Sequence, residues 1–255
     1  MFCAALTERG KLSFPLNIFK SLTKDKYELK TVPVYRGAPF YLLKITLYRG
    51  QEPGGEEIVR LVGKCSKKLL AGGIPLPQIK EIGFFNGDLL YRRLIENTFL
   101  EILKRNFNRR EPYDLAIVDT DGRCTSFSLS CAPFCKSMTV ITKRKEEYYL
   151  TVEEIKNRTG LCPSVQESAA FKSVTADLSG CELTVRGRGE PIIFKNGIGF
   201  EPAEVYSQLV PEGIDRFNFY SALYELCGVF ELGNGIFTEI EANGKKMTVT
   251  DIGFS

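Results

Sequence analysis

Residues 115–126 (LAIVDTDGRCTS) have the types and spacing that could perform chemistry. Four apolar residues run into an Asp-Thr-Asp-Gly turn, and a helix-like segment follows. A turn of this kind, between a strand and a helix, is where α/β proteins place their ligands. Asp119 and Asp121 are therefore candidate catalytic carboxylates. The candidate ligand-binding residues of the same turn are Gly122, Arg123 and Thr125.

The run of apolar residues before Asp-x-Asp-Gly resembles the first motif of the haloacid dehalogenase superfamily of phosphohydrolases. The resemblance implies that Asp119 attacks phosphorus and that Asp121 serves as acid and base, both near Mg²⁺. A carboxylate can form a covalent phospho-intermediate without His, and Mg²⁺ prefers carboxylate oxygens. The resemblance covers about six residues. Arg123 stands where Thr is usual, Thr142 follows too soon after the first motif, and the sequence has no Asp-Asp pair.

The order of strand, turn, helix and strand over residues 114–144 resembles the start of a Rossmann unit. The second strand runs into Thr142, Lys143 and Arg144, which are further candidate ligand-binding residues. Rossmann enzymes that use the 2′-phosphorylated cofactor often carry basic residues at this point, so the resemblance implies NADP rather than NAD.

The glycine-rich fingerprint of such units is missing, because the turn DTDGRCTS has one glycine. Asp119 and Asp121 also lie beside the position of an anion. Two like charges at ~4 Å repel by ~4 kcal/mol at an effective dielectric constant of ~20. A third interpretation needs no chemistry: the Asp and Gly residues form a turn and a helix cap. The sheet would then be a scaffold that binds another macromolecule, with the basic loop at 186–190 (RGRGE) as a contact.

The absence of His excludes Ser-His and Cys-His catalysis and any imidazole metal ligand. No two of the eight Cys have Cys-x-x-Cys spacing, so we assign no metal ligands and expect small, buried, reduced thiols.

The elements that must position the turn follow from hydrophobic periodicity. Residues 27–35 and 39–48 predict two strands, and apolar residues at helical spacing predict a helix over 56–70, ended by Gly72-Gly73. A long amphipathic helix is predicted over 88–107. Pro112 follows it, so we expect an N-terminal α+β subdomain over 1–110 and an α/β core over 111–255.

Within the core, strands and helices alternate as β-α-β-α-β, which predicts a parallel, Rossmann-like sheet with right-handed crossovers. The strands are predicted at 113–120, 138–143 and 161–168, and the helices at 125–136 and 150–160. Pro133 predicts that the first of these helices is short or kinked. After residue 169 we predict strands at 181–187 and 191–197, helices at 202–209 and 217–227, and a hairpin at 237–252 with Asn243-Gly244 as its turn.

The composition is that of an ordinary globular protein, with 255 residues, 44% hydrophobic and 25% charged. The net charge of +3, from 34 basic and 31 acidic residues, is too small to indicate nucleic acid or a membrane surface as a partner. No apolar run approaches the ~20 residues of a membrane span, and the first residues lack a secretory signal. We therefore expect a soluble, cytoplasmic α/β protein that binds a small phosphorylated ligand or a protein partner. The Mg²⁺-dependent phosphohydrolase and the NADP-binding protein stand as alternatives.

Overall fold

The computed structural model describes residues 1–255 apart from 12–22, 49–51, 169, 171, 187–189 and 255. The chain forms two compact units, each assembled from two separate segments. The first unit holds Met1–Leu90 and Pro202–Gly233, and the second holds Tyr91–Glu201 and Asn234–Ser255. This division differs from the single boundary near residue 110 that the sequence indicated. Helix breakers mark where an element ends, but they do not show which core a later segment joins.

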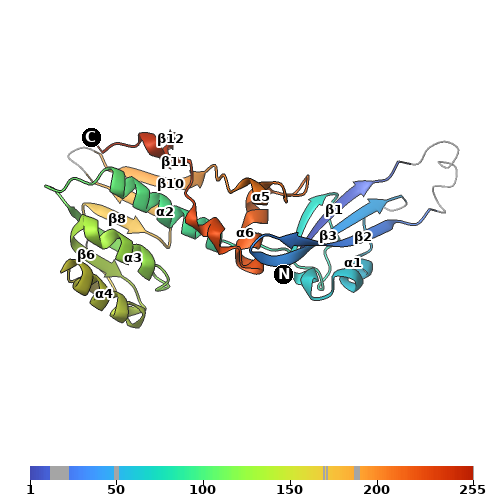
Figure 1. The fold of residues 1–255 in the computed structure, drawn as a ribbon, viewed down its shortest axis with the longest axis horizontal. Helices are drawn as coiled ribbons and strands as arrows, with labels where there is room; N and C mark the ends of the chain where they lie inside the picture. Colours follow the sequence, from blue (N-terminus) through green and yellow to red (C-terminus); the bar gives the residue numbers. More distant parts are fainter. Residues whose placement is uncertain (12–22, 49–51, 169, 171, 187–189, 255) are drawn as a thin grey trace. The chain divides into compact units, whose positions relative to one another are not determined.

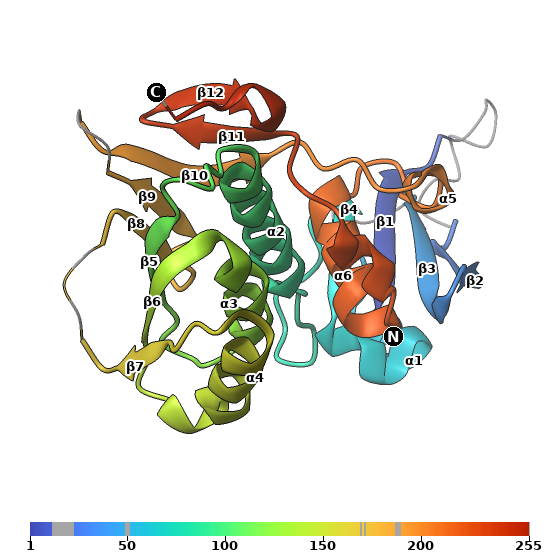
Figure 2. The ribbon, with the colours of Figure 1, turned by 60° about the vertical axis from the view of Figure 1, so that its left-hand side comes forward.

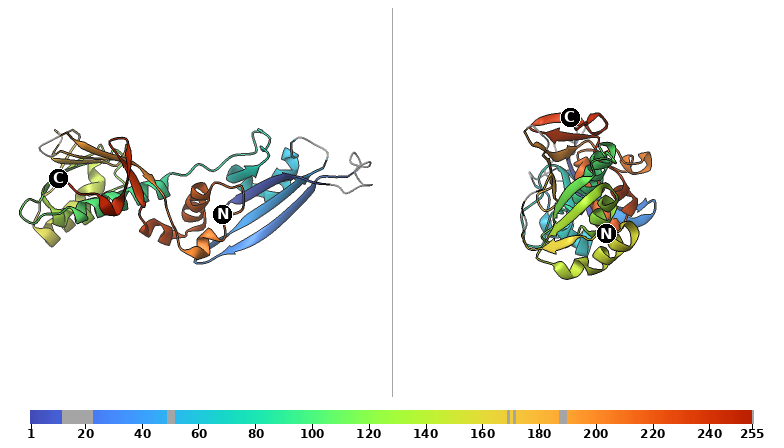
Figure 3. Two further views of the ribbon diagram at one scale, coloured as in Figure 1. Left: turned by 90° about the horizontal axis from the view of Figure 1, so that it is seen from above. Right: turned by 90° about the vertical axis from the view of Figure 1, so that its left-hand side faces the viewer.

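The first unit is built on a four-stranded sheet with the order β2-β3-β1-β4 (Figure 1). Strand β1 pairs in parallel with β3 and β4, and β2 forms an antiparallel hairpin with β3 (Figure 3). The predicted strands at 27–35 and 39–48 are confirmed, whereas β1 and β4 were not predicted. The strands are β1 (Cys3–Arg9), β2 (Lys26–Val34), β3 (Gly37–Leu47) and β4 (Leu69–Gly73).

The helix predicted over 56–70 is wrong in its second half. Helix α1 (Gly55–Val62) ends at Gly63, whose φ is 55°, and a 3₁₀ turn (Gly63–Lys67) follows. The next apolar residues, Leu69 and Leu70, pair with β1 and are buried as part of β4. Sheet pairing therefore overrides the helical spacing, and Gly72-Gly73 lies at the end of a strand.

Helices pack on both faces of this sheet. Ile58 and Val62 of α1 lie in a buried cluster with Leu43, Ile45 and neighbouring apolar residues. On the opposite face, the ring of Phe219 from α6 (Arg216–Cys227) stands edge-on to Phe2 and Phe40, with ring centroids 5.7 and 5.2 Å away. The short helix α5 (Glu204–Ser207) precedes α6. Both helices were predicted in these places, and the second segment of the unit thus completes its core.

The second unit is built on an eight-stranded sheet with the order β12-β11-β10-β9-β8-β5-β6-β7. Strands β7, β6, β5 and β8 are parallel, and the pairs from β8 to β12 are antiparallel. The parallel strands are β5 (Tyr113–Val118), β6 (Cys135–Ile141), β7 (Ser164–Gln166) and β8 (Val174–Asp177). The others are β9 (Glu182–Val185), β10 (Ile192–Ile198), β11 (Glu239–Ala242) and β12 (Lys245–Thr248).

Helices α2 (Leu89–Arg105), α3 (Thr125–Cys131) and α4 (Tyr149–Thr159) lie on one side of this sheet (Figure 2). The predicted β-α-β-α-β order and the long helix are confirmed, which establishes a mixed α/β architecture with parallel-sheet segments. Helix α3 is short, and a 3₁₀ turn that contains Pro133 follows it. The hairpin of β11 and β12 is also confirmed, with positive φ at Asn243 and Gly244. Strand β8 was not predicted.

All eight Cys are free. Cys162 is exposed, Cys135 and Cys181 are partly buried, and the other five are buried. Burial raises the pKa of Cys3 to about 12 and that of Cys227 to about 11, which agrees with small, buried thiols. Within the described residues, no helix combines the length and apolar character that crossing a membrane requires.

Candidate functional site

The predicted turn lies at the carboxyl end of β5, the strand at the centre of the parallel segment. Strands β6 and β7 lie on one side of β5, and β8 lies on the other. The last residue of β5, Val118, is in register with Ile141 of β6 and Asp177 of β8. The loops after β5 and β8 are therefore neighbours, at a place where the strand order reverses. Open α/β sheets commonly bind ligands at such a point.

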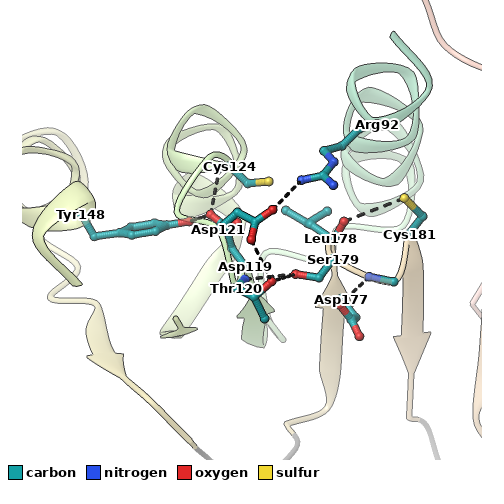
Figure 4. Close-up of polar contacts among 11 residues, drawn as sticks. Arg92, Asp119, Thr120, Asp121, Cys124, Tyr148, Asp177, Leu178, Ser179 and Cys181 are labelled. Atoms are coloured by element: carbon teal, nitrogen blue, oxygen red, sulfur yellow. Dashed lines mark hydrogen bonds and ion pairs between the residues drawn. The ribbon is translucent and has the colours of Figure 1, made fainter. Parts of the chain in front are cut away.

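Asp119 is 1% exposed and points into the protein. Its Oδ2 accepts a hydrogen bond of 2.8 Å from the backbone N–H of Cys124, immediately before α3. The same oxygen accepts a second bond, of 2.6 Å, from the hydroxyl of Tyr148 (Figure 4). Burial and the bond to Asp119 raise the pKa of Tyr148, so its hydroxyl stays protonated and donates. The carboxylate thus joins the turn, the start of α3 and the segment before α4.

Asp121 and Asp119 do not form a pair. The Oδ2 of Asp121 lies 3.7 Å from Nη1 of Arg92 on α2, and the Asp121 side chain is half-exposed (Figure 4). The described residues contain no group of three or more Cys, Asp or Glu that could hold a metal ion. Each carboxylate has a different neighbour, whereas the phosphohydrolase interpretation needs both beside one Mg²⁺.

Two hydroxyls connect the loops after β5 and β8. The Oγ of Ser179 accepts a hydrogen bond of 3.0 Å from the backbone N–H of Thr120 and lies 2.9 Å from its Oγ1. Both residues are exposed. In the turn after β8, the backbone N–H of Gly180 donates to Oδ1 of Asp177. The loop after β8 therefore forms one wall of the site, with groups suited to hydrogen bonding.

The segment after β6 packs directly on the turn at Gly122. This glycine has a φ of 70°, and a Cβ placed on it would lie 3.0 Å from both Arg144 Cβ and Glu147 Cγ. The position therefore needs glycine for its backbone conformation and for the close approach of its neighbours. In consequence, the chain's own side chains occupy the space over the turn.

The other predicted site residues have separate environments. Thr142 is buried, and its Oγ1 accepts a hydrogen bond of 3.0 Å from the backbone N–H of Arg144. Arg144 is exposed, and its Nη1 lies 3.9 Å from Oε1 of Glu147. Thr125 is the first residue of α3 and is half-buried, and Arg123 and Lys143 are exposed. The structure thus brings Gly122 and Arg144 together, while Thr142 holds the loop after β6.

Sequence patterns missed a buried carboxyl behind the turn. Glu96 of α2 is 6% exposed, and its Oε2 lies 3.2 Å from Nη1 of Arg93. Burial raises the pKa of Glu96, while contacts with Cys124 and Arg93 oppose this rise. The pKa of the Cys124 thiol is raised by burial first and by Glu96 second. The hydrophobic pattern places Glu96 with Arg92 and Arg93 on the polar face of this helix, so the prediction of a solvated Glu96 is wrong, and no local pattern indicates its burial.

Tyr148, Ser179 and Arg92 were also missed. Tyr148 reaches Asp119 from 29 positions along the chain, and no local pattern encodes such a contact. Ser179 follows a strand of only four residues, too short to show periodicity.

No known protein family matches the sequence, and neither curated proteins nor solved structures include a detectable match.

Proposed function

We propose that this chain is a binding protein whose second unit derives from a nucleotide-binding type of fold and recognises a protein partner at the carboxyl edge of its parallel strands. The observation that carries the proposal is the position of the Asp119 carboxylate. It lies at the start of α3, where a nucleotide-binding fold holds a phosphate, and accepts the hydrogen bonds of Cys124 and Tyr148.

The bonds to Asp119 argue against a bound phosphate. A phosphate at a helix start is held by free backbone N–H groups, and Asp119 already takes the N–H of Cys124. A second anion at ~4 Å from this carboxylate would be repelled by ~4 kcal/mol at an effective dielectric constant of ~20. Arg144 and Glu147 also crowd the space above Gly122. A phosphate directly over Gly122 would therefore meet these two residues.

The same bonds argue against Asp119 as a nucleophile. A carboxylate that attacks phosphorus must reach the substrate, and this side chain is 1% exposed. Attack through Oδ2 would also require the loss of both hydrogen bonds. The phosphohydrolase alternative remains testable: it requires Mg²⁺-dependent release of phosphate from an aryl phosphate, abolished by Asp119→Asn.

Two exposed apolar residues supply the contact surface for a partner. Tyr149 is 70% exposed and Leu150 is 85% exposed. They directly follow Tyr148, at the start of α4, and therefore lie next to the candidate site at the turn after β5. Exposed aromatic and apolar side chains of this kind are typical anchors of protein interfaces. Tyr149 and Leu150 are the residues that we expect a partner to bury.

Co-purification from the native host tests the proposal. We expect the wild-type protein to retain a specific partner and the Tyr149→Ser, Leu150→Ser double variant to lose it. Met247→Ser is the matched control, because Met247 lies on β12 of the same unit and is 38% exposed. Equal retention by the double variant and the control would refute the role of this surface.

A second candidate function is NADP binding, and one observation favours it. The parallel order β7-β6-β5-β8 matches the strand order 3-2-1-4 within a dinucleotide-binding sheet, with Lys143 and Arg144 in the loop after β6. A dye-based thermal melt with NADP and NAD separates the candidates. A ligand at 100 times its Kd stabilises by about 2.7 kcal/mol. A shift with NADP that Arg144→Glu removes would overturn the partner proposal, whereas no shift with either dinucleotide supports it.

A further inference from the structure

A cavity of about 480 Å³ lies in the first unit, toward the carboxyl ends of its parallel strands β1, β3 and β4. Cavities of this size are typical of small-molecule sites, and open sheets with parallel strands commonly bind ligands at this end. All of the lining residues belong to the first unit. Those that matter here are Leu6, Glu8, Leu42, Lys44, Gly72 and Glu212.

Leu6 and Leu42 form an apolar floor on the face of the sheet opposite to α1. Alternate residues of a strand point to opposite faces, and Ala5 and Leu43 belong to the buried cluster that contains α1. Phe2, which shares the face of Leu6, is covered by α6. Leu6 lies four residues further along β1, which corresponds to roughly 13 Å at ~3.3 Å per residue. The cavity therefore lies next to the part of this face that α6 covers.

The turn before α6 forms the wall of the cavity on the side of β4. The backbone N–H of Ile214 donates to the carbonyl of Pro211 at 3.2 Å, and Gly213 between them has a φ of 84°. A Cβ placed on Gly72 would lie 2.6 Å from the carbonyl oxygen of Gly213, so glycine at this position lets the turn pack directly on β4. This contact fixes the turn on the sheet and holds the exposed Glu212 at the rim of the cavity.

Lys44 and Glu8 place opposite charges at neighbouring points above the floor. Lys44 is in register with Leu6, and Glu8 lies two residues further along β1, so both side chains share the face of the cavity. Within the described part of the chain, no ion pair joins the two groups. Oε1 of Glu8 accepts a hydrogen bond of 3.3 Å from the hydroxyl of Thr46, and its carboxylate retains further acceptor sites. The space between the two charges is therefore available to a ligand.

The carboxylate opposite Lys44 on β2 is that of Glu28, and it has a closer partner. Glu28 is the cross-strand neighbour of Lys44, but it forms an ion pair with Lys26. The hydrogen bond and the charge of Lys26 are the main causes that lower the pKa of Glu28, and the charges of Lys30 and Lys44 contribute less. The lining therefore has a cation on the side of β3 and carboxylates on the side of β1 and β4.

We propose that this cavity binds a small zwitterion with an apolar side group, a molecule of the α-amino-acid class. Its carboxylate lies beside Lys44, its ammonium group lies beside Glu8, and its apolar group covers Leu6 and Leu42. A zwitterion fits this lining better than an anion or a cation, because both charged groups of the floor then have a partner of opposite sign. This site is in the first unit, so it stands or falls independently of the partner surface at 149–150 in the second.

Calorimetry with L-leucine, and with two analogues of similar shape that each lack one charge, tests the proposal. The analogue 4-methylpentanoate lacks the ammonium group, and 3-methylbutylamine lacks the carboxylate. Lys44→Gln and Glu8→Gln are the test variants. Lys64→Gln and Glu56→Gln are the matched controls, because both residues are exposed, belong to the same unit and lie outside the cavity. Circular dichroism verifies that each variant is folded.

We expect L-leucine to bind the wild type about tenfold or more tightly than either analogue, and each test variant to weaken this binding by about tenfold or more. In Lys44→Gln, L-leucine and 3-methylbutylamine should bind with similar affinity, because the partner of the carboxylate is gone. In Glu8→Gln, L-leucine and 4-methylpentanoate should become similar for the corresponding reason. A loss of structure would instead weaken all three ligands alike.

Three results would overturn the proposal. The first is that L-leucine does not bind the wild type. The second is that an analogue with a single charge binds the wild type as tightly as L-leucine does. The third is that the control variants weaken the binding of L-leucine as much as the test variants do.

Discussion

Asp119 joins three parts of the second unit through one oxygen, and this gives it a structural role that can be measured. In Asp119→Asn the one remaining side-chain oxygen can take the place of Oδ2, which accepts both the Cys124 N–H and the Tyr148 hydroxyl, but the acceptor loses its negative charge. We expect the free energy of unfolding to fall by about 1–3 kcal/mol, because hydrogen bonds to a charged acceptor are stronger than those to a neutral one. Urea denaturation measures the change.

Tyr148→Phe is the companion variant for this prediction. It removes one hydrogen bond and should lower the free energy of unfolding by about 0.5–1.5 kcal/mol. In the double variant Asp119→Asn, Tyr148→Phe, the free energy of unfolding should fall by less than the sum of the two single decreases, because the two residues share one hydrogen bond. If Asp119→Asn unfolds at the wild-type urea concentration, the carboxylate is not structural and a catalytic role returns to consideration.

Glu96 makes stability depend on pH with a definite sign. Its pKa in the folded protein is raised by burial, so the contribution of this group to stability is full below its unfolded pKa of about 4.3 and declines as pH rises through the folded pKa. Glu96→Gln removes the ionisation. We therefore expect the variant to gain stability relative to the wild type at neutral pH and to lose that gain in acid. Urea midpoints at both pH values measure the difference, and a larger gain in acid would contradict the prediction.

At the scale of elements, the turn after β5 is held in place by the segment that follows β6. Gly122 and Gly160 both have positive φ, but a Cβ on Gly160 would meet no heavy atom within 4 Å, whereas one on Gly122 would meet Arg144 and Glu147. Gly160→Ala should therefore lower the free energy of unfolding by only about 1–2 kcal/mol, which is the cost of placing a residue with a Cβ in a left-handed backbone conformation. Gly122→Ala should destabilise by more. Equal thermal shifts in the two variants would show that the close packing at Gly122 has no energetic effect.

The elements that the sequence predicted correctly are those whose own residues carry a complete signal. Helix α2 has four turns of apolar residues, and the β11–β12 hairpin has an Asn-Gly turn. Strands β4 and β8 have five and four residues, too few to establish a period. Leu69 and Leu70 also fit a helix until β1 pairs with them.

The candidate site shows the same division between local and distant information. Asp119 and the glycine turn were visible because they are neighbours in the sequence. The hydroxyl groups that form hydrogen bonds with this turn were not predicted, because Tyr148 and Ser179 belong to other loops that are distant in the sequence.

At the scale of the whole molecule, each unit needs two distant segments of the chain. Phe2 and Phe40 are covered by Phe219, which lies in the second segment of the first unit. Residues 1–90 alone should therefore fail to melt cooperatively, because full burial of an aromatic side chain contributes about 1.5–3 kcal/mol. A fusion of 1–90 to 202–233 through a Gly/Ser linker should restore cooperative melting by circular dichroism. Cooperative melting of 1–90 alone at the same midpoint would contradict this expectation.

The rate at which the buried thiols react with a reagent measures how often the surrounding structure opens. Cys162 is exposed and should react with a maleimide at once, whereas the buried thiols should react only when their surroundings come apart. Cys3, Cys65 and Cys227 belong to the first unit, and Cys124 and Cys131 belong to the second. Mass spectrometry of the time course would therefore give a separate rate for each unit without any engineered label. Equal rates for the two sets would mean that the units open together, and unequal rates would show which of them gives way first.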